Sequence, residues 1–274
     1  MEKATVSTGF RLSRFIDPLP IYIMWLREMK RLMRSKGRLV PELVMPVLFL
    51  VFLGIPLSLM SSGGQSEMFG LPPGMGFLDY LAPGIVGMTI LFSSLMGGGS
   101  LVWDKEFGFL KEVLVAPVNR FSILLGRQVG TMTISIGQAF IVIIIALFLG
   151  VNFQSSAEVA LSIVFMILTS TIFIGLGLIL ATRLGEMEGF MAVLMIFQMP
   201  MFLISLAIFP VELMPSWVKY IIYINPFTYG VDGLRGSLVG FSYFPLLLDF
   251  GVLLAWAVVL AGLGTRFFST MEAD

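Results

Sequence analysis

The chain has 274 residues, of which 57% are hydrophobic and 12% are charged, whereas a soluble domain is about 45–50% apolar and about 25% charged. A soluble globular fold is therefore excluded. The 17 basic and 17 acidic residues cancel, so the chain lacks the excess positive charge that nucleic-acid binding requires. With no cysteine and no histidine, it also lacks the residues of disulfides, Cys/His metal sites and Ser-His-Asp triads, and we expect no catalytic and no metal-binding residues.

Six long apolar stretches dominate the sequence. A helix that crosses a membrane needs about 20 predominantly apolar residues, and each of the six has 20 to 23. They predict an all-α membrane protein with one membrane domain over residues 39–268, preceded by an N-terminal segment, 1–38, and followed by a tail, 269–274. The predicted spans are Leu39–Met60, Tyr80–Leu101, Val129–Leu149, Val159–Ala181, Phe190–Phe209 and Phe244–Gly264.

The basic residues predict how these spans are oriented, because Lys and Arg are retained on the cytoplasmic side of short loops. Nine of the 17 precede the first span, and the loop over residues 61–79 has none. If successive loops lie on opposite sides of the membrane, 15 of the 17 basic residues lie on the same side. We therefore predict that both termini are cytoplasmic, which an even number of spans permits.

The N-terminal segment mixes aromatic and aliphatic residues with arginine and lysine between Ile21 and Arg38. This composition predicts a basic amphipathic helix that lies in the headgroup region of the membrane. A solvated leader that only enforces the orientation is the alternative.

The loop after the second span carries a second amphipathic pattern. Phe107, Leu110 and Leu114 stand at helical spacing between charged residues, and Pro117 disfavours helical backbone at the residue before it. The pattern predicts a short helix on the cytoplasmic face. Such a helix either presents a docking surface or only packs on its own bundle.

The loop before the last span predicts a pair of short helices in the outer leaflet, surface-lying or re-entrant, over Ser216–Ile224 and Pro226–Val239. Asn225 is a good N-cap, and Pro226 then occupies the first helical position. Within the second helix, Asp232 and Arg235 stand three residues apart and can pair on one face. A solvated pair is the interpretation that the spacing favours.

The polar residues within the spans are few. No Asp, Glu, Lys or Arg lies in the middle of a predicted span, which argues against an ion-coupled carrier. The chain also has no Gly-x-x-x-x-Gly-Lys-[Ser/Thr] phosphate loop, so we expect any ATP hydrolysis on another chain. Gln138 and Gln198 are candidates for a substrate path, although most such groups only bond to a neighbouring helix.

Three segments together resemble the ABC-2-type permeases, the membrane subunits of one class of ATP-binding-cassette exporters, and among them the daunorubicin-resistance type. Phe109 departs from this pattern, because many members have threonine there, and the departure leaves the subfamily and its substrate open. The segments are Trp103–Arg120 followed by Ile123–Arg127, the Asn-Pro-containing Ile224–Arg235, and the proline-punctuated Met45–Leu50.

The resemblance implies that the loop after the second span is the coupling helix that docks on an ATPase, with the N-terminal amphipathic helix as a second contact. Glu106 would then face a basic group on the partner, or it only caps or solvates the start of the helix. Gly108 would permit close approach of the two backbones. Carried over residue by residue, the ATPase-coupling residues are Asp104, Glu106, Gly108, Phe109 and Leu110.

The resemblance further implies an exporter in a prokaryotic cell membrane that moves drugs or other small hydrophobic or lipid-like compounds. ATP and Mg²⁺ would bind to the partner ATPase and not to this chain. A second permease copy and membrane lipid are the other expected partners, and nucleic acid is not expected. Two alternatives stay open, namely a permease for a lipid-linked glycan and an ATPase-independent channel or scaffold.

Overall fold

The computed structural model describes residues 17–34, 36–61, 70–72, 74–109, 118–154 and 156–269. Every regular element in this part of the chain is a helix, which confirms the all-α prediction. Residues 1–16, 110–117 and 270–274 lie outside the described residues; they include Leu110, most of the predicted coupling helix and most of the predicted tail. The elements are α1 (Pro18–Arg34), α2 (Lys36–Phe49), the π-helical turn η1 (Leu50–Gly54), α3 (Ile55–Ser61), α4 (Phe77–Met96), α5 (Gly99–Glu106), α7 (Arg120–Phe148), α8 (Ser156–Arg183), α9 (Met187–Leu203), the 3₁₀ turn η3 (Val211–Leu213), α10 (Ser216–Ile224), α11 (Pro226–Val239) and α12 (Leu246–Ser269).

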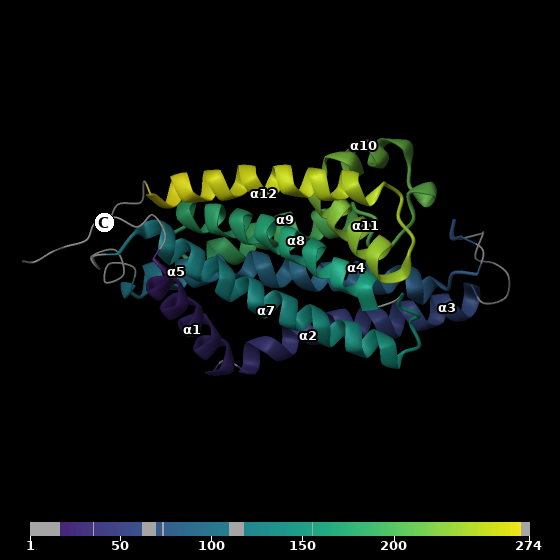
Figure 1. Cartoon of the computed structure of the whole chain (residues 1–274), viewed down its shortest axis with the longest axis horizontal. Coiled ribbons are helices and arrows are strands. Elements are labelled where there is room, and N and C mark those ends of the chain that lie inside the picture. Colours follow the sequence, from purple (N-terminus) through teal and green to yellow (C-terminus); the bar gives the residue numbers. More distant parts are fainter. Residues whose placement is uncertain are drawn as a thin grey trace, which may run out of the picture.

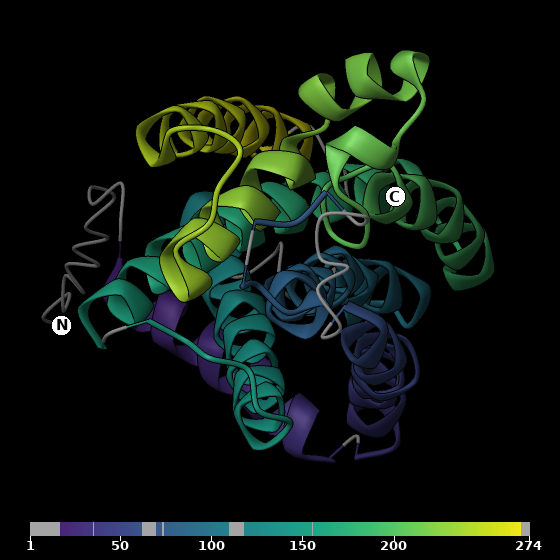
Figure 2. The same cartoon turned by 90° about the vertical axis from the view of Figure 1, so that its right-hand side faces the viewer.

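The long helices run side by side along the long axis of the molecule (Figure 1). At one end, which we call the α5 end, α5 and α1 lie near the C-terminal end of α12. At the other end, which we call the α10 end, lie α10 and α3. A view along the bundle places α4 in its centre (Figure 2), and nearly every residue of α4 is buried.

Five helical stretches in the described part of the chain are long and apolar enough to cross a membrane, and each overlaps a predicted span. The remaining predicted span, Phe190–Phe209, corresponds to α9, whose 17 residues are fewer than the about 20 of a typical crossing. The chain is thus a multi-pass membrane protein with one shorter apolar helix. The five stretches are Val40–Ser61, Phe77–Glu106, Arg120–Phe148, Glu158–Arg183 and Leu246–Gly264.

The side chain of Asn225 accounts for the early end of α9. Its Nδ2 donates to the backbone oxygens of Met201, at 2.8 Å, and Ile204, at 2.7 Å, near the C-terminal end of α9. Its Oδ1 accepts from the backbone N–H of Phe227 at 3.0 Å, which confirms Asn225 as the N-cap of α11. One amide thus satisfies the termini of two helices that a membrane core would leave unsatisfied.

The amphipathic helix α1 packs along α7. A Cβ on Gly126 of α7 would lie 2.7 Å from the backbone oxygen of Ile21, so the two backbones approach closely. The outward face of α1 is apolar in part, because Tyr22 and Met33 are more than half exposed. The described part of the N-terminal segment is therefore a helix that is attached to the bundle.

Candidate functional site

The α5 end presents exposed aromatic side chains where the long central helix terminates. The exposed fractions are 42% for Trp103, 62% for Phe107 and 56% for Phe109. The rings of Trp103 and Phe107 lie 5.3 Å apart, and Glu106, the last residue of α5, is also exposed. Large aromatic side chains that a chain leaves exposed together mark a surface for contact with another molecule.

Gly108 ends α5 by its backbone conformation. Its φ is +75°, which residues with a Cβ rarely adopt. A Cβ at this position would meet no atom of the described residues within 4 Å. The glycine therefore allows a turn, and it does not serve close packing against the part of the chain that the structure describes.

Asp104 occupies a different environment from the other predicted coupling residues, because its side chain is buried. One carboxylate oxygen accepts from Nη2 of Arg27 on α1 and the other from Nη2 of Arg127 on α7. Nη1 of Arg127 also donates to the hydroxyl of Ser100 at 2.8 Å. We call Arg27, Asp104 and Arg127 the arginine–aspartate triad; it joins α1, α5 and α7, and its aspartate follows the exposed Trp103 in the chain.

Lys105, the next residue, joins α5 to a further helix. Its Nζ donates to the backbone oxygens of Ala181 at 2.9 Å, Thr182 at 3.0 Å and Leu184 at 3.4 Å. These carbonyls lie at the C-terminal end of α8, where helix carbonyls lack intrahelical partners and carry partial negative charge. The contact of Lys105 with the end of α8 was not predicted from the sequence.

The structure places the two candidate substrate-path glutamines on different helices. Gln138 of α7 is buried, and its Nε2 donates to Oε2 of Glu42 on α2 at 2.8 Å. Gln198 of α9 is half-buried. Gln138 thus bonds to a neighbouring helix, which is the alternative to a place on the substrate path. Glu42 and Glu28 line a small polar cavity nearby.

We expect Gln138→Leu to lower the free energy of unfolding by about 1–3 kcal/mol, because it removes a buried hydrogen bond to a carboxylate. Denaturant titration in detergent micelles measures the change. Gln198→Leu is the matched control and should change the free energy by less than about 0.5 kcal/mol. Equal losses in both variants would contradict a structural bond at Gln138.

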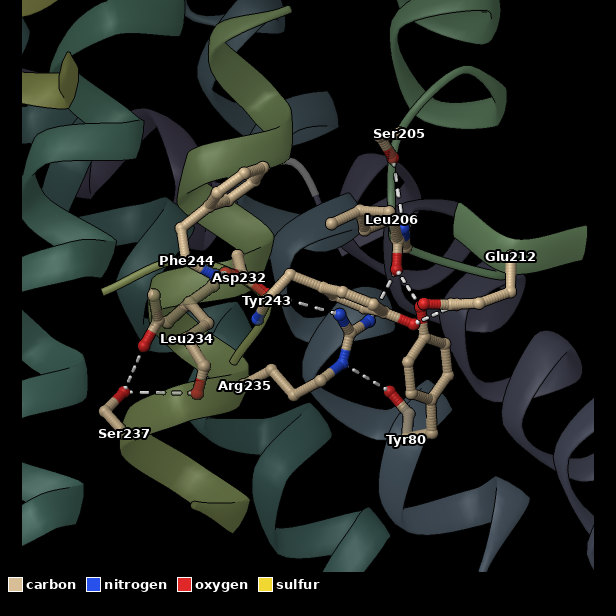
Figure 3. Close-up of polar contacts among 12 residues, drawn as sticks. Tyr80, Ser205, Leu206, Glu212, Asp232, Leu234, Arg235, Ser237, Tyr243 and Phe244 are labelled. Atoms are coloured by element: carbon tan, nitrogen blue, oxygen red, sulfur yellow. Dashed lines mark hydrogen bonds and ion pairs between the residues drawn. The ribbon is translucent and has the colours of Figure 1, made fainter. Parts of the chain in front are cut away.

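A buried polar cluster at the α10 end centres on Arg235 of α11, which is fully buried (Figure 3). Its Nε donates to the backbone oxygen of Tyr80 at 3.2 Å and its Nη2 to that of Leu206 at 2.5 Å. The guanidinium carbon lies 3.8 Å from the centre of the Tyr80 ring, and the Tyr80 hydroxyl donates to the same Leu206 oxygen at 3.0 Å. Arg235 therefore fixes α11 to α4 and to the chain that follows α9.

Asp232 belongs to the same cluster and is also fully buried. Its Oδ1 and Oδ2 accept from the backbone N–H groups of Tyr243, at 3.0 Å, and Phe244, at 2.8 Å, and Oδ1 lies 3.9 Å from Nη1 of Arg235. Burial raises the pKa of the Asp232 carboxyl, while Arg235 and the two N–H groups oppose that rise. The prediction of a solvated pair is wrong, because α11 is enclosed by α4, α8 and α12.

A sequence profile of the ABC-2 type transporter family matches residues 20–239, which extend from α1 to the end of α11. The chain belongs to the ABC-2 type transporter family. This match confirms the resemblance to ABC-2-type permeases that we identified from the loop after the second span and from the Asn-Pro segment. The match includes both the α5 end and the buried cluster at the α10 end.

Several proteins that are similar to this chain are named as transporters or as transport permeases. The chain is 29% identical over 236 residues to ycf38 of Cyanophora paradoxa, which is named as a transport permease; the match covers 85% of this chain and 77% of the relative. It is 25% identical over 161 residues to YbhR of Escherichia coli K12, named as a multidrug ABC transporter permease, with 58% and 44% covered. It is 28% identical over 195 residues to ABC transporter G family member 20 of Dictyostelium discoideum, with 69% and 26% covered. This ABC-2 family member is a membrane transporter permease, and its family indicates a transport subunit rather than an enzyme.

Proposed function

We propose that the chain is the membrane subunit of an ATP-binding-cassette exporter that moves drugs or other hydrophobic or lipid-like compounds out across a plasma membrane. A separate ATPase, which binds ATP and Mg²⁺, docks on the α5 end and drives transport. The α5 end then faces the cytoplasm, together with both termini. The observation that carries the proposal is the set of exposed aromatics around Glu106 at the end of the central helix.

The family and one relative support the remaining parts of the proposal. Membership of the ABC-2 type transporter family supports an ATPase partner and a second permease copy, and the multidrug name of YbhR supports the class of cargo. The exposed apolar side chains of η1 and α9, such as Phe52 and Ile196, offer surfaces for that second copy and for lipid. Coupling is assigned to Glu106, Gly108 and Phe109, with Leu110 beyond the described residues and Asp104 acting through the arginine–aspartate triad. Gln138 and Gln198 remain the candidates for the substrate path.

Glu106→Arg tests the docking surface. We expect the wild-type chain, purified in mild detergent from its own membranes, to carry an approximately equimolar ATPase with a phosphate loop and with measurable ATP hydrolysis. Reversing the charge of Glu106 should lower the amount of bound ATPase at least about tenfold, because an interface that loses a charge partner and gains repulsion loses more than about 1.4 kcal/mol.

Lys219→Glu on α10 is the matched control, because it reverses one charge at the opposite end of the bundle. It should retain the ATPase at the wild-type level. Recovery of the wild-type chain alone, under conditions that preserve other membrane complexes, would favour a channel or scaffold that needs no ATPase. Equal retention by Glu106→Arg and the control would show that the ATPase does not dock at Glu106.

A further inference from the structure

Besides the arginine–aspartate triad, the α5 end has a second connection to the rest of the bundle. It begins with Lys105, whose side chain caps the C-terminal end of α8. An ammonium group has three N–H donors, and Lys105 points its ammonium at three carbonyls at the end of α8. The basic residue in the last turn of α8, Arg183, lies instead over the ring of Phe267 on α12, 4.7 Å from its centre. The cap on α8 therefore comes from α5, one residue from the exposed Glu106.

The backbones of the two elements also touch. A Cβ on Gly98, where α4 gives way to α5, would lie 2.2 Å from the backbone oxygen of Gly177 on α8. A Cβ on Gly177 would in turn lie 2.5 Å from the backbone oxygen of Leu95. No side chain separates the helices at this point, so a movement of α5 reaches α8 without slack.

The middle of α8 packs closely against α11 through two of its side chains. A Cβ on Gly233 of α11 would lie 2.3 Å from the ring of Phe165, and one on Gly230 would lie 2.6 Å from Oγ1 of Thr169. Both partners belong to α8. Phe165 and Ala181 are 16 residues apart along α8, at about 1.5 Å each, so this part of α8 joins the α5 end to the helix that holds the buried Arg235 cluster.

We propose that α8 is the rod that transmits movement from the α5 end to the α10–α11 hairpin, and that Lys105 is the positioning residue that attaches α8 to the docking end. The inference rests on the proposed function, because an ATPase on the α5 end supplies the movement. A push or pull on the docking surface displaces α8 along its axis. The hairpin follows, because the glycine contacts leave no room between α11 and α8.

The chain contains no cysteine, so cysteines introduced into the purified permease can be spin-labelled without background from the permease, before the ATPase is added. One label replaces Tyr220 of α10, which is 74% exposed, and the other Phe148 of α7, which is 88% exposed. Pulsed EPR of the complex with its ATPase compares the distance without nucleotide and with ATP and vanadate. When Lys105 is unchanged, we expect trapping with ATP and vanadate to shift the distance between the two labels. Lys105→Met should reduce the shift to less than half while ATPase binding persists, and Lys105→Arg should restore it.

Glu188→Gln is the matched control, because it removes the charge of an exposed residue on α9, outside the proposed docking elements, and it should leave the shift unchanged. A full shift in Lys105→Met would overturn the proposal. A second measurement needs no variant of Lys105: labels at Ile167 of α8 and Ile144 of α7, both exposed, should report movement of α8 on ATP trapping. An ATPase that hydrolyses ATP without moving α8 would refute the rod, whereas a wild-type chain that binds no ATPase would refute the proposed function itself.

Discussion

Asp104→Ala is expected to lower the free energy of unfolding by about 3–5 kcal/mol, because it removes the shared carboxylate of two arginines. The side chain of Arg127 is 1% exposed and cannot reach water, whereas that of Arg27 is 33% exposed and can turn outward. The cost therefore arises mainly from an uncompensated charge at Arg127. Denaturant titration of the purified permease in detergent measures it.

A double variant distinguishes this cause from a loss of packing. Asp104→Ala with Arg127→Met removes both the anion and the buried cation, so it should recover a large part of the lost stability. Glu188→Ala, at an exposed acidic residue of α9, should change the free energy by less than about 0.5 kcal/mol. A double variant less stable than Asp104→Ala would contradict the charge argument.

Arg235→Met should cost a similar amount, about 3–5 kcal/mol, at the opposite end of the molecule. It leaves the buried Asp232 carboxylate without its cation and removes one of the two donors on the Leu206 oxygen. The α11 helix then loses the hydrogen bond and the cation–π contact that Arg235 makes with Tyr80 of α4. Hydrogen exchange should show faster exchange over residues 226–239, and Lys219→Met on α10 should leave that exchange unchanged.

The pH dependence of the Arg235→Met deficit tests its electrostatic origin. Burial raises the pKa of Asp232 in the folded protein, and loss of Arg235 removes a group that opposes this rise. The folded state then binds the proton more tightly than the unfolded state, so stability falls as the pH rises between the unfolded and folded pKa values. The deficit should therefore be smaller at pH 5 than at pH 8, and a deficit that grows on acidification would contradict the account.

Where the sequence contains residues that start or end a helix, it predicted the bounds of that helix correctly. The bounds of α10 and α11 match the prediction, because Asn225 and Pro226 define a helix start within two residues and Gly240, at φ +76°, ends α11. Hydropathy located the spans but overextended the one after Phe190. The apolar run continues to Phe209, yet α9 ends at Leu203 because Asn225, some 20 residues later in the chain, takes up its last carbonyls. A hydropathy pattern contains no information on that bond.

The motif in the loop after the second span predicted a docking segment but not the direction of each side chain. Glu106 and Phe109 are exposed, as a docking role requires, whereas Asp104 faces inward. Its partners are 77 residues away, at Arg27, and 23 residues away, at Arg127. Such pairs form only when α1, α5 and α7 pack together, and no spacing in the sequence predicts that packing. Lys105 was missed for the same reason.

The most direct test of the central claim places a photo-crosslinking analogue of phenylalanine at Phe109 and irradiates the cells that contain the permease. Tyr220, exposed at the α10 end, is the matched control position. The account predicts that the probe at Phe109 captures a subunit that carries a phosphate loop and hydrolyses ATP, and that the probe at Tyr220 does not. Capture of that subunit from Tyr220 alone, or from neither position, would contradict an ATPase docked on the α5 end.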